Sequence, residues 1–188
     1  MQEMMYDAFI SYRHKDKKIA EKLQRLLEQY RPPHSIAAKT GIKRLGCVFL
    51  DRTELPTSRD LGDSLTDALS KSRYLIVILT DEYNESEWCM EELRQFKKMC
   101  GEQLNRVIPV LVSGESQNVF PEELLVEKYE EKDVNGTIHT VTKKIKPLYC
   151  DIRADNESKI MRNLSREYLR IAATILGCGY DQLIISTE

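Results

Sequence analysis

A tryptophan and a glutamate lie four positions apart, at positions 88 and 92, shortly after a continuous apolar stretch. The stretch, residues 74–80, is predicted to be a strand, and residues 86–93 are predicted to be the first turns of the next helix. Residues four apart share one helix face, so Trp88 and Glu92 are expected to point the same way. Ligands of open α/β sheets bind beyond the carboxyl ends of the strands. A carboxylate and an indole ring there could hold a planar, cationic or sugar-linked group, whereas the alternative is a core tryptophan beside a solvated glutamate.

Apolar strands alternate with amphipathic helices along the 188 residues. We expect strands over residues 6–12, 45–50, 74–80, 106–112 and 147–152. We expect helices over residues 17–30, around residues 61–69, from about residue 86 to Gly101, and over residues 157–176. This alternation predicts an α/β fold in which a five-stranded parallel sheet carries helices on both faces.

Three local features refine this plan. Asn84 is predicted to cap the third helix, with Glu87 as its capping-box partner. Pro109 inside a predicted strand indicates an edge position or a bulge, because proline cannot donate a ladder hydrogen bond. Residues 34–44 are polar and are predicted to form a loop.

A β-hairpin insertion is predicted before the last strand. Residues 126–146 contain Asn135 and Gly136 between two strand-like runs, which is typical of a hairpin with a tight turn. We therefore interpret residues 1–178 as one domain with this insertion. Residues 179–188 are interpreted as a C-terminal extension, whose apolar pattern either packs back on the domain or leads into a further region.

Composition excludes several classes of function. A net charge of −2 gives no basic surface for nucleic acid or anionic lipid. We expect neither a signal sequence, because residues 1–5 are short and acidic, nor a membrane span, because no apolar run is long enough. The five cysteines form no C-x-x-C pair, which predicts buried thiols in a reducing, cytoplasmic setting. The histidines are isolated from one another, so no metal site is expected; they are His14, His34 and His139.

Four segments, in order, resemble the sequence boxes of a bacterial TIR (Toll/interleukin-1 receptor) domain. They are residues 6–13, 48–56, 70–80 and 86–93. The resemblance extends over residues 4–176 and implies a flavodoxin-like sheet that associates with other TIR domains. One departure is that residues 57–59 stand where the family often has a glycine, while the nearest glycine here is Gly62.

In many members the family cleaves NAD⁺ at the nicotinamide–ribose bond, so the resemblance implies an NAD⁺ hydrolase of bacterial signalling or defence. NAD⁺ would be the substrate, and no separate cofactor is implied. Glu92, and not its neighbour Glu91, occupies the position of the family's catalytic glutamate. The resemblance implies a substrate pocket formed by Ser11, Tyr12, Arg13, Asp51, Leu55 and Trp88.

The loop that follows the second strand is implied to act as a lid and as a contact with a neighbouring TIR domain. Its interface residues would be Arg52, Leu55, Pro56 and Arg59. Pro56 restricts the backbone of Leu55, which could present that side chain outward at low entropic cost. The alternative is a solvated turn that only joins a strand to a helix.

Other functions remain to be weighed against this one. A non-enzymatic TIR adaptor carries the same boxes, although it needs no acid at position 92. A phosphate-accepting receiver domain is rejected, because the first strand ends in Ser11, Tyr12 and Arg13 and not in an acidic pair. No glycine-rich dinucleotide turn supports a dehydrogenase. For the enzyme, the product could be ADP-ribose or a cyclic form.

Overall fold

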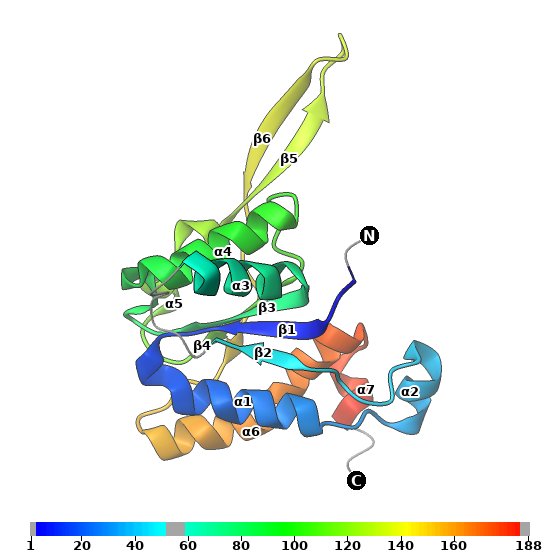
Figure 1. The fold of residues 1–188 in the computed structure, drawn as a ribbon, viewed down its shortest axis with the longest axis vertical. Helices are drawn as coiled ribbons and strands as arrows, with labels where there is room; N and C mark the ends of the chain where they lie inside the picture. Colours follow the sequence, from blue (N-terminus) through cyan, green and yellow to red (C-terminus); the bar gives the residue numbers. More distant parts are fainter. Residues whose placement is uncertain (1–2, 52–58, 185–188) are drawn as a thin grey trace.

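Five parallel strands form the central sheet in the computed structural model, which describes residues 3–51 and 59–184 (Figure 1). The strands are β1 (Tyr6–Ser11), β2 (Val48–Leu50), β3 (Ser72–Leu79), β4 (Val107–Leu111) and β7 (Cys150–Asp151). They lie in the order β2-β1-β3-β4-β7, and every neighbouring pair is parallel. The chain reverses its direction of travel across the sheet at β1 and β3, as in flavodoxin-like folds. The predicted fold class is confirmed.

Helices cover both faces of this sheet (Figure 1). One layer contains α1 (Lys17–Gln29), α2 (His34–Thr40), α6 (Glu157–Leu176) and α7 (Tyr180–Ile184). The other layer contains α3 (Arg59–Ser70), α4 (Glu87–Met99) and α5 (Ser116–Val119). Short 3-10 turns are η1 (His14–Asp16), η2 (Tyr83–Glu85) and η3 (Glu122–Leu124). Leu183 of α7 is buried, so the described part of the C-terminal extension packs on the domain.

The continuous apolar run of β3 supplies both layers of the core. Leu75, Val77 and Leu79 pack in the layer of α3 and α4. Ile76 and Ile78 pack in the layer of α1 and α6. All five side chains are fully buried. Successive side chains of a strand point to opposite faces, so a strand with helices on both faces needs no polar positions.

The loop predicted over residues 34–44 is wrong for residues 34–40, because α2 forms there. Pro33 precedes the helix, and Gly41 ends it with a φ of +76°. Ile36 is the buried residue of this helix. A seven-residue helix with one buried side chain shows no 3.6-residue periodicity, so its pattern could not indicate a helix.

The predicted cap of α4 is also wrong. The η2 turn contains Asn84, whose side-chain amide donates to the carbonyl of Val119 at 3.0 Å. The helix begins two residues later than that prediction requires, and Ser86 is its N-cap. The Ser86 hydroxyl accepts from the backbone N–H of Cys89 at 3.2 Å, which satisfies one free donor of the first turn.

Pro109 does not mark an edge strand, because β4 lies between β3 and β7. Its partner in β3 is Val77. The pairing of β4 with β7 consists of Val110 and Leu111, which follow the proline. The missing N–H of Pro109 therefore falls just before β7 joins the sheet, where no ladder donor is required.

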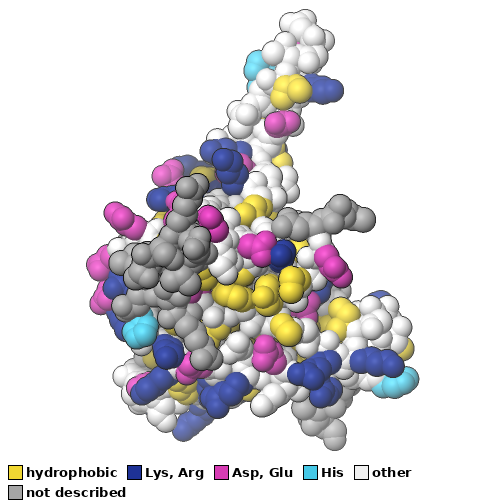
Figure 2. Space-filling model, viewed as in Figure 1, with side chains coloured by type: hydrophobic (Ala, Val, Ile, Leu, Met, Phe, Trp, Pro, Cys, Tyr) yellow, Lys and Arg dark blue, Asp and Glu magenta, His cyan; other side chains and the backbone are white. Residues whose placement is uncertain are grey.

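The insertion forms the predicted hairpin, with β5 (Val126–Lys132) antiparallel to β6 (Ile138–Lys144). It projects from the α3 and α4 side of the molecule (Figure 1). Charged and hydrophobic side chains are interspersed along this projection in Figure 2, and Val134 and Ile138 are exposed near its tip. The turn spans residues 133–137 and is wider than a two-residue turn, with Gly136 at a φ of +81°.

Within the part of the chain that the structure describes, no helix has the length and apolar character of a membrane span.

Candidate active site

Glu92 lies in the second turn of α4 with its carboxyl group directed into the protein. Its exposed fraction is 4%. Oε2 accepts a hydrogen bond from the hydroxyl of Ser11, the last residue of β1. Oε1 is buried and finds no hydrogen-bond partner among residues 3–51 and 59–184. One oxygen of the carboxyl group is therefore held by the sheet, while the other has unused hydrogen-bonding capacity.

A buried chain of hydroxyl groups stands behind Ser11. The Ser11 Oγ lies 2.8 Å from the hydroxyl oxygen of Tyr83, which belongs to η2. The Tyr83 hydroxyl also reaches the backbone carbonyl of Cys89, at 3.2 Å. Ser11 and Tyr83 are both fully buried. The chain connects the end of β1, the η2 turn and the first turn of α4, which together fix the position of Glu92.

Trp88 binds the residue that follows β2. Its indole Nε1–H donates to Oδ2 of Asp51 at 3.2 Å, and Asp51 is buried. A small depression between α3 and α4 is lined on the α4 side by Trp88, Glu91 and Glu92. Trp88 and Glu92 thus share a helix face, as their spacing predicts, and Trp88 is only partly buried.

Burial raises the pKa of Glu92 well above its usual value. The hydrogen bond from Ser11 opposes this shift, because it stabilises the charged carboxylate. The negative charge of nearby Asp51 adds to the shift. Burial therefore favours the protonated form of Glu92 more than in an exposed glutamate, and a cationic ligand beside it would favour the ionised form.

Two other residues predicted for the pocket face elsewhere. Tyr12 packs in the core layer of α1 and α6, on the other side of the sheet from Glu92. The Arg13 guanidinium donates to the backbone carbonyl of Glu82 at 2.8 Å and lies 3.8 Å from the carboxylate of Glu85. The structure brings Ser11, Asp51, Trp88 and Glu92 together and directs Tyr12 and Arg13 away from them.

The remaining predicted residues concern the loop after β2. Arg52, Leu55 and Pro56 lie outside the described residues, and Arg59 is the first residue of α3. Glu91, the neighbour of Glu92, is exposed and accepts a hydrogen bond from Gln95 at 2.9 Å. Of the two adjacent glutamates, Glu92 is therefore the one whose carboxyl group the fold encloses.

Sequence reasoning missed Tyr83 and Cys89. The available signal was a single tyrosine within a polar stretch, because a buried tyrosine needs a partner for its hydroxyl group. Cys89 donates from Sγ to the carbonyl of Tyr12 at 3.4 Å. Burial and the nearby Glu92 raise the pKa of Cys89 to about 11, so it remains a thiol at neutral pH and is poorly suited to act as a nucleophile.

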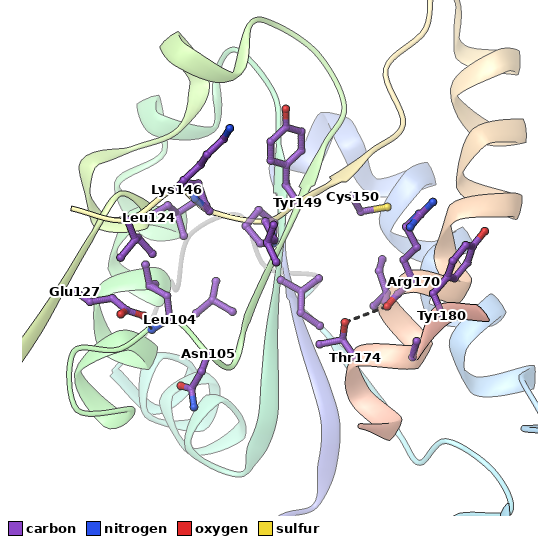
Figure 3. Close-up of a pocket in the computed structure, with 18 of the residues that line it drawn as sticks. Leu104, Asn105, Leu124, Glu127, Lys146, Tyr149, Cys150, Arg170, Thr174 and Tyr180 are labelled. Atoms are coloured by element: carbon purple, nitrogen blue, oxygen red, sulfur yellow. Dashed lines mark hydrogen bonds between the residues drawn. The ribbon is translucent and has the colours of Figure 1, made fainter. Parts of the chain in front are cut away.

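A separate cavity of about 580 Å³ opens at the β4–β7 edge of the sheet. Leu104, Tyr149, Arg170 and Thr174 are among the residues around it (Figure 3). The residues that line this cavity do not include Ser11, Asp51, Trp88 or Glu92. Within the described ranges, no group of three or more His, Cys, Asp or Glu side chains could hold a metal ion.

The fold and the site together define a flavodoxin-like domain with a buried carboxyl group near the carboxyl ends of β1 and β2. Comparison with known protein families identifies the family of this domain, because residues 8–141 match the TIR domain model. The chain belongs to the TIR domain family.

Similar proteins come from a bacterium, an animal and a plant. The chain is 33% identical over 113 residues to the NAD(+) hydrolase ApTIR of Actinoplanes sp., covering 60% of this chain and 15% of that protein. It is 29% identical over 92 residues to Toll-like receptor 2 of Ovis aries, covering 48% of this chain and 10% of the receptor. It is 31% identical over 138 residues to the Arabidopsis thaliana protein SUPPRESSOR OF npr1-1, CONSTITUTIVE 1, covering 68% of this chain and 9% of that protein.

Among solved structures, the TIR domains of the activated Roq1 resistosome are similar at 25% sequence identity and a TM-score of 0.39, with 58% of this chain and 59% of that chain covered. The chain thus spans only a small part of the curated relatives described above.

Proposed function

We propose that this domain hydrolyses NAD⁺ at the bond between nicotinamide and ribose, with Glu92 as the catalytic carboxylate. The observation that carries the proposal is the carboxyl group of Glu92: Ser11 holds one oxygen, and the other is buried without a partner among the described residues. The similarity to a protein named as an NAD(+) hydrolase supports the same reaction.

One carboxylate is sufficient for this chemistry. Most glycosidases use two, because the departing alkoxide must be protonated as the glycosidic bond breaks. The nicotinamide of NAD⁺ is a pyridinium and leaves as a neutral base, so no general acid is required. The remaining task is to stabilise the oxocarbenium-like ribose, which a fixed carboxylate in a largely dry site can perform.

The protonation state of Glu92 would depend on whether the substrate is bound. Burial keeps the pKa of its carboxyl group high in the absence of ligand. The positive pyridinium of NAD⁺ would lower that pKa on binding, since an opposite charge nearby favours the ionised form. The substrate would thus generate the carboxylate that stabilises its own transition state.

Association with other TIR domains is the second part of the proposal. Residues 51–59 would contact a neighbouring copy and complete the substrate pocket, with Leu55 as an apolar contact. The attacking group is either water, which gives ADP-ribose, or an atom of the same nucleotide, which gives a cyclic product. The reaction would take place in the cytoplasm, where NAD⁺ is available.

The test is NAD⁺ turnover by concentrated protein, with nicotinamide release as the measurement. Glu92→Gln keeps the size of the side chain and one acceptor oxygen while removing its charge. We expect a loss of at least about a hundredfold, comparable to losing a group that stabilises transition-state charge. Glu91→Gln is the matched control and should retain activity, because the Glu91 carboxylate is exposed. Full activity in Glu92→Gln would overturn the assignment.

A non-enzymatic interaction module is the second candidate. Its support is the similarity to Toll-like receptor 2 and the near-complete enclosure of Glu92, which also suits a residue of the core. If the wild-type protein releases no nicotinamide at any concentration, this candidate replaces the first.

A further inference from the structure

We propose that Tyr83 is a positioning residue for Glu92, acting through the hydroxyl group of Ser11. The inference rests on the proposed function, in which Glu92 is the catalytic carboxylate. Its basis is the hydroxyl chain that runs from the carbonyl of Cys89 through Tyr83 and Ser11 to Oε2 of Glu92.

The protons of this chain can be arranged in two ways. When Glu92 is ionised, Ser11 donates to Oε2 and accepts from the Tyr83 hydroxyl. When Glu92 is protonated, its carboxyl O–H donates a hydrogen bond to Ser11 Oγ. Ser11 then donates to the Tyr83 hydroxyl, and Tyr83 donates to the carbonyl of Cys89. The Tyr83 hydroxyl lies within reach of both alternatives, 2.8 Å from Ser11 Oγ and 3.2 Å from the Cys89 carbonyl oxygen. Every hydroxyl group then keeps a partner in both charge states.

This reversibility needs a hydroxyl group at position 83. Phenylalanine would fill the same apolar space, because the ring of Tyr83 packs among the core residues of the α3 and α4 layer. Without the hydroxyl, however, Ser11 loses its donor when Glu92 is ionised and its acceptor when Glu92 is protonated. Both Ser11 and Tyr83 are fully buried, so water does not readily replace the missing partner.

The consequence for the reaction concerns the two oxygens of Glu92. A Ser11 hydroxyl that is fixed by Tyr83 holds Oε2 in one position. The orientation of the carboxyl group is then fixed as well, and Oε1 is left without a hydrogen bond among the described residues. Tyr83 touches neither oxygen in any hydrogen bond of the described structure, so it acts only through Ser11. Hydrogen-bonded chains strengthen each bond by polarisation, which gives Tyr83 an effect at this distance.

The kinetic test is a double-mutant cycle on nicotinamide release. Tyr83→Phe should lower kcat about five- to tenfold, equivalent to one hydrogen bond, with little change in KM. Ser11→Ala should lower kcat by at least as much, and adding Tyr83→Phe to it should have little further effect. Tyr74→Phe is the matched control: its hydroxyl binds the Thr174 carbonyl at 3.2 Å, far from Glu92, and kcat should not change. If Tyr83→Phe lowers kcat by the same factor in the wild-type and Ser11→Ala backgrounds, the proposal is overturned.

A second measurement does not depend on activity. The side-chain carboxyl carbon of Glu92 can be titrated by ¹³C NMR, with Glu92→Gln identifying the signal. Tyr83→Phe should shift the titration midpoint in the protein with Ser11 and leave it unchanged in Ser11→Ala. No shift, or the same shift in both backgrounds, would overturn the proposal. Absence of NAD⁺ cleavage in the wild-type protein would instead refute only the proposed function, because the titration still decides whether Tyr83 acts on Glu92.

Discussion

Trp88 donates its indole N–H to the carboxylate of Asp51, which ties the first turn of α4 to the end of β2. The contact keeps Asp51 buried beside the site of Glu92. Asp51 therefore has two effects on that site. It fixes the indole ring, and its negative charge raises the pKa of Glu92.

These two effects can be separated by Asp51→Asn. The asparagine side-chain oxygen can still accept from Trp88, while the negative charge is lost. Glu92 must be ionised to stabilise a cationic transition state, so removing a nearby negative charge should extend activity to lower pH. We expect the midpoint of the pH–kcat profile to fall to lower pH. Asp155→Asn, which removes an exposed charge paired with Lys159, should leave the midpoint unchanged. A midpoint that does not move, or moves up, contradicts this prediction.

Glu92→Gln should stabilise the domain at neutral pH while abolishing turnover. The pKa of Glu92 in the folded protein lies well above 4.5, its usual value. Between these two values the unfolded chain is ionised and the folded chain holds a proton, so rising pH favours unfolding. Glutamine removes this dependence. The Tm should rise by about 2–4 °C for each kcal/mol gained, with the difference increasing from about pH 5 upward.

The matched control for this measurement is Glu91→Gln, because Glu91 is exposed on the same helix. Its Tm should follow that of the wild-type protein across the pH range. A Glu92→Gln protein that is less stable than wild type at pH 7 would show that the ionised carboxylate contributes to folding, contrary to the shift inferred from burial.

The sequence was sufficient to predict the sheet, because its signals are local. The apolar run of β3 reflects burial in both core layers, and the helical periodicity of the 20-residue α6 reflects burial of one face in a single layer. The hairpin was visible for the same reason, since Gly136 favours a turn between two strand-like runs. By contrast, α2 has one buried residue, Ile36, which is too little to produce a pattern.

The site was only partly predictable, because its contacts join residues far apart in the chain. The spacing of Trp88 and Glu92 placed both on one helix face, and the family resemblance added Ser11 and Asp51. Neither source indicated Tyr83, whose partner Ser11 is 72 positions away. The family resemblance also placed Tyr12 in the pocket, although strand alternation directs Tyr12, which follows Ser11 at the end of β1, to the opposite side of the sheet.

The β5–β6 hairpin should be dispensable for folding and for catalysis. Tyr129 and Val141 are directly paired across it, so residues 130–140 can be replaced by Asn-Gly as a two-residue turn. This retains the contacts at its base, including the bond from Lys97 Nζ to the Val126 carbonyl. We expect the free energy of unfolding to change by less than about 1 kcal/mol, since the removed residues lie outside the core. Loss of nicotinamide release in a folded, shortened protein would instead assign the hairpin a part in activity.

Leu55→Asp should abolish the dependence of activity on protein concentration. If a neighbouring domain completes the pocket through the loop after β2, specific activity should increase with concentration, because a larger fraction of the protein is assembled. A charged side chain in an apolar contact carries a desolvation penalty, so the variant should assemble about ten- to a hundredfold less readily. The matched control is Val134→Asp, the same type of change at an exposed position of the hairpin turn, which should behave as wild type. Nicotinamide release measured from dilute to concentrated protein decides the matter: a specific activity that is constant for the wild-type domain excludes assembly as the source of its activity.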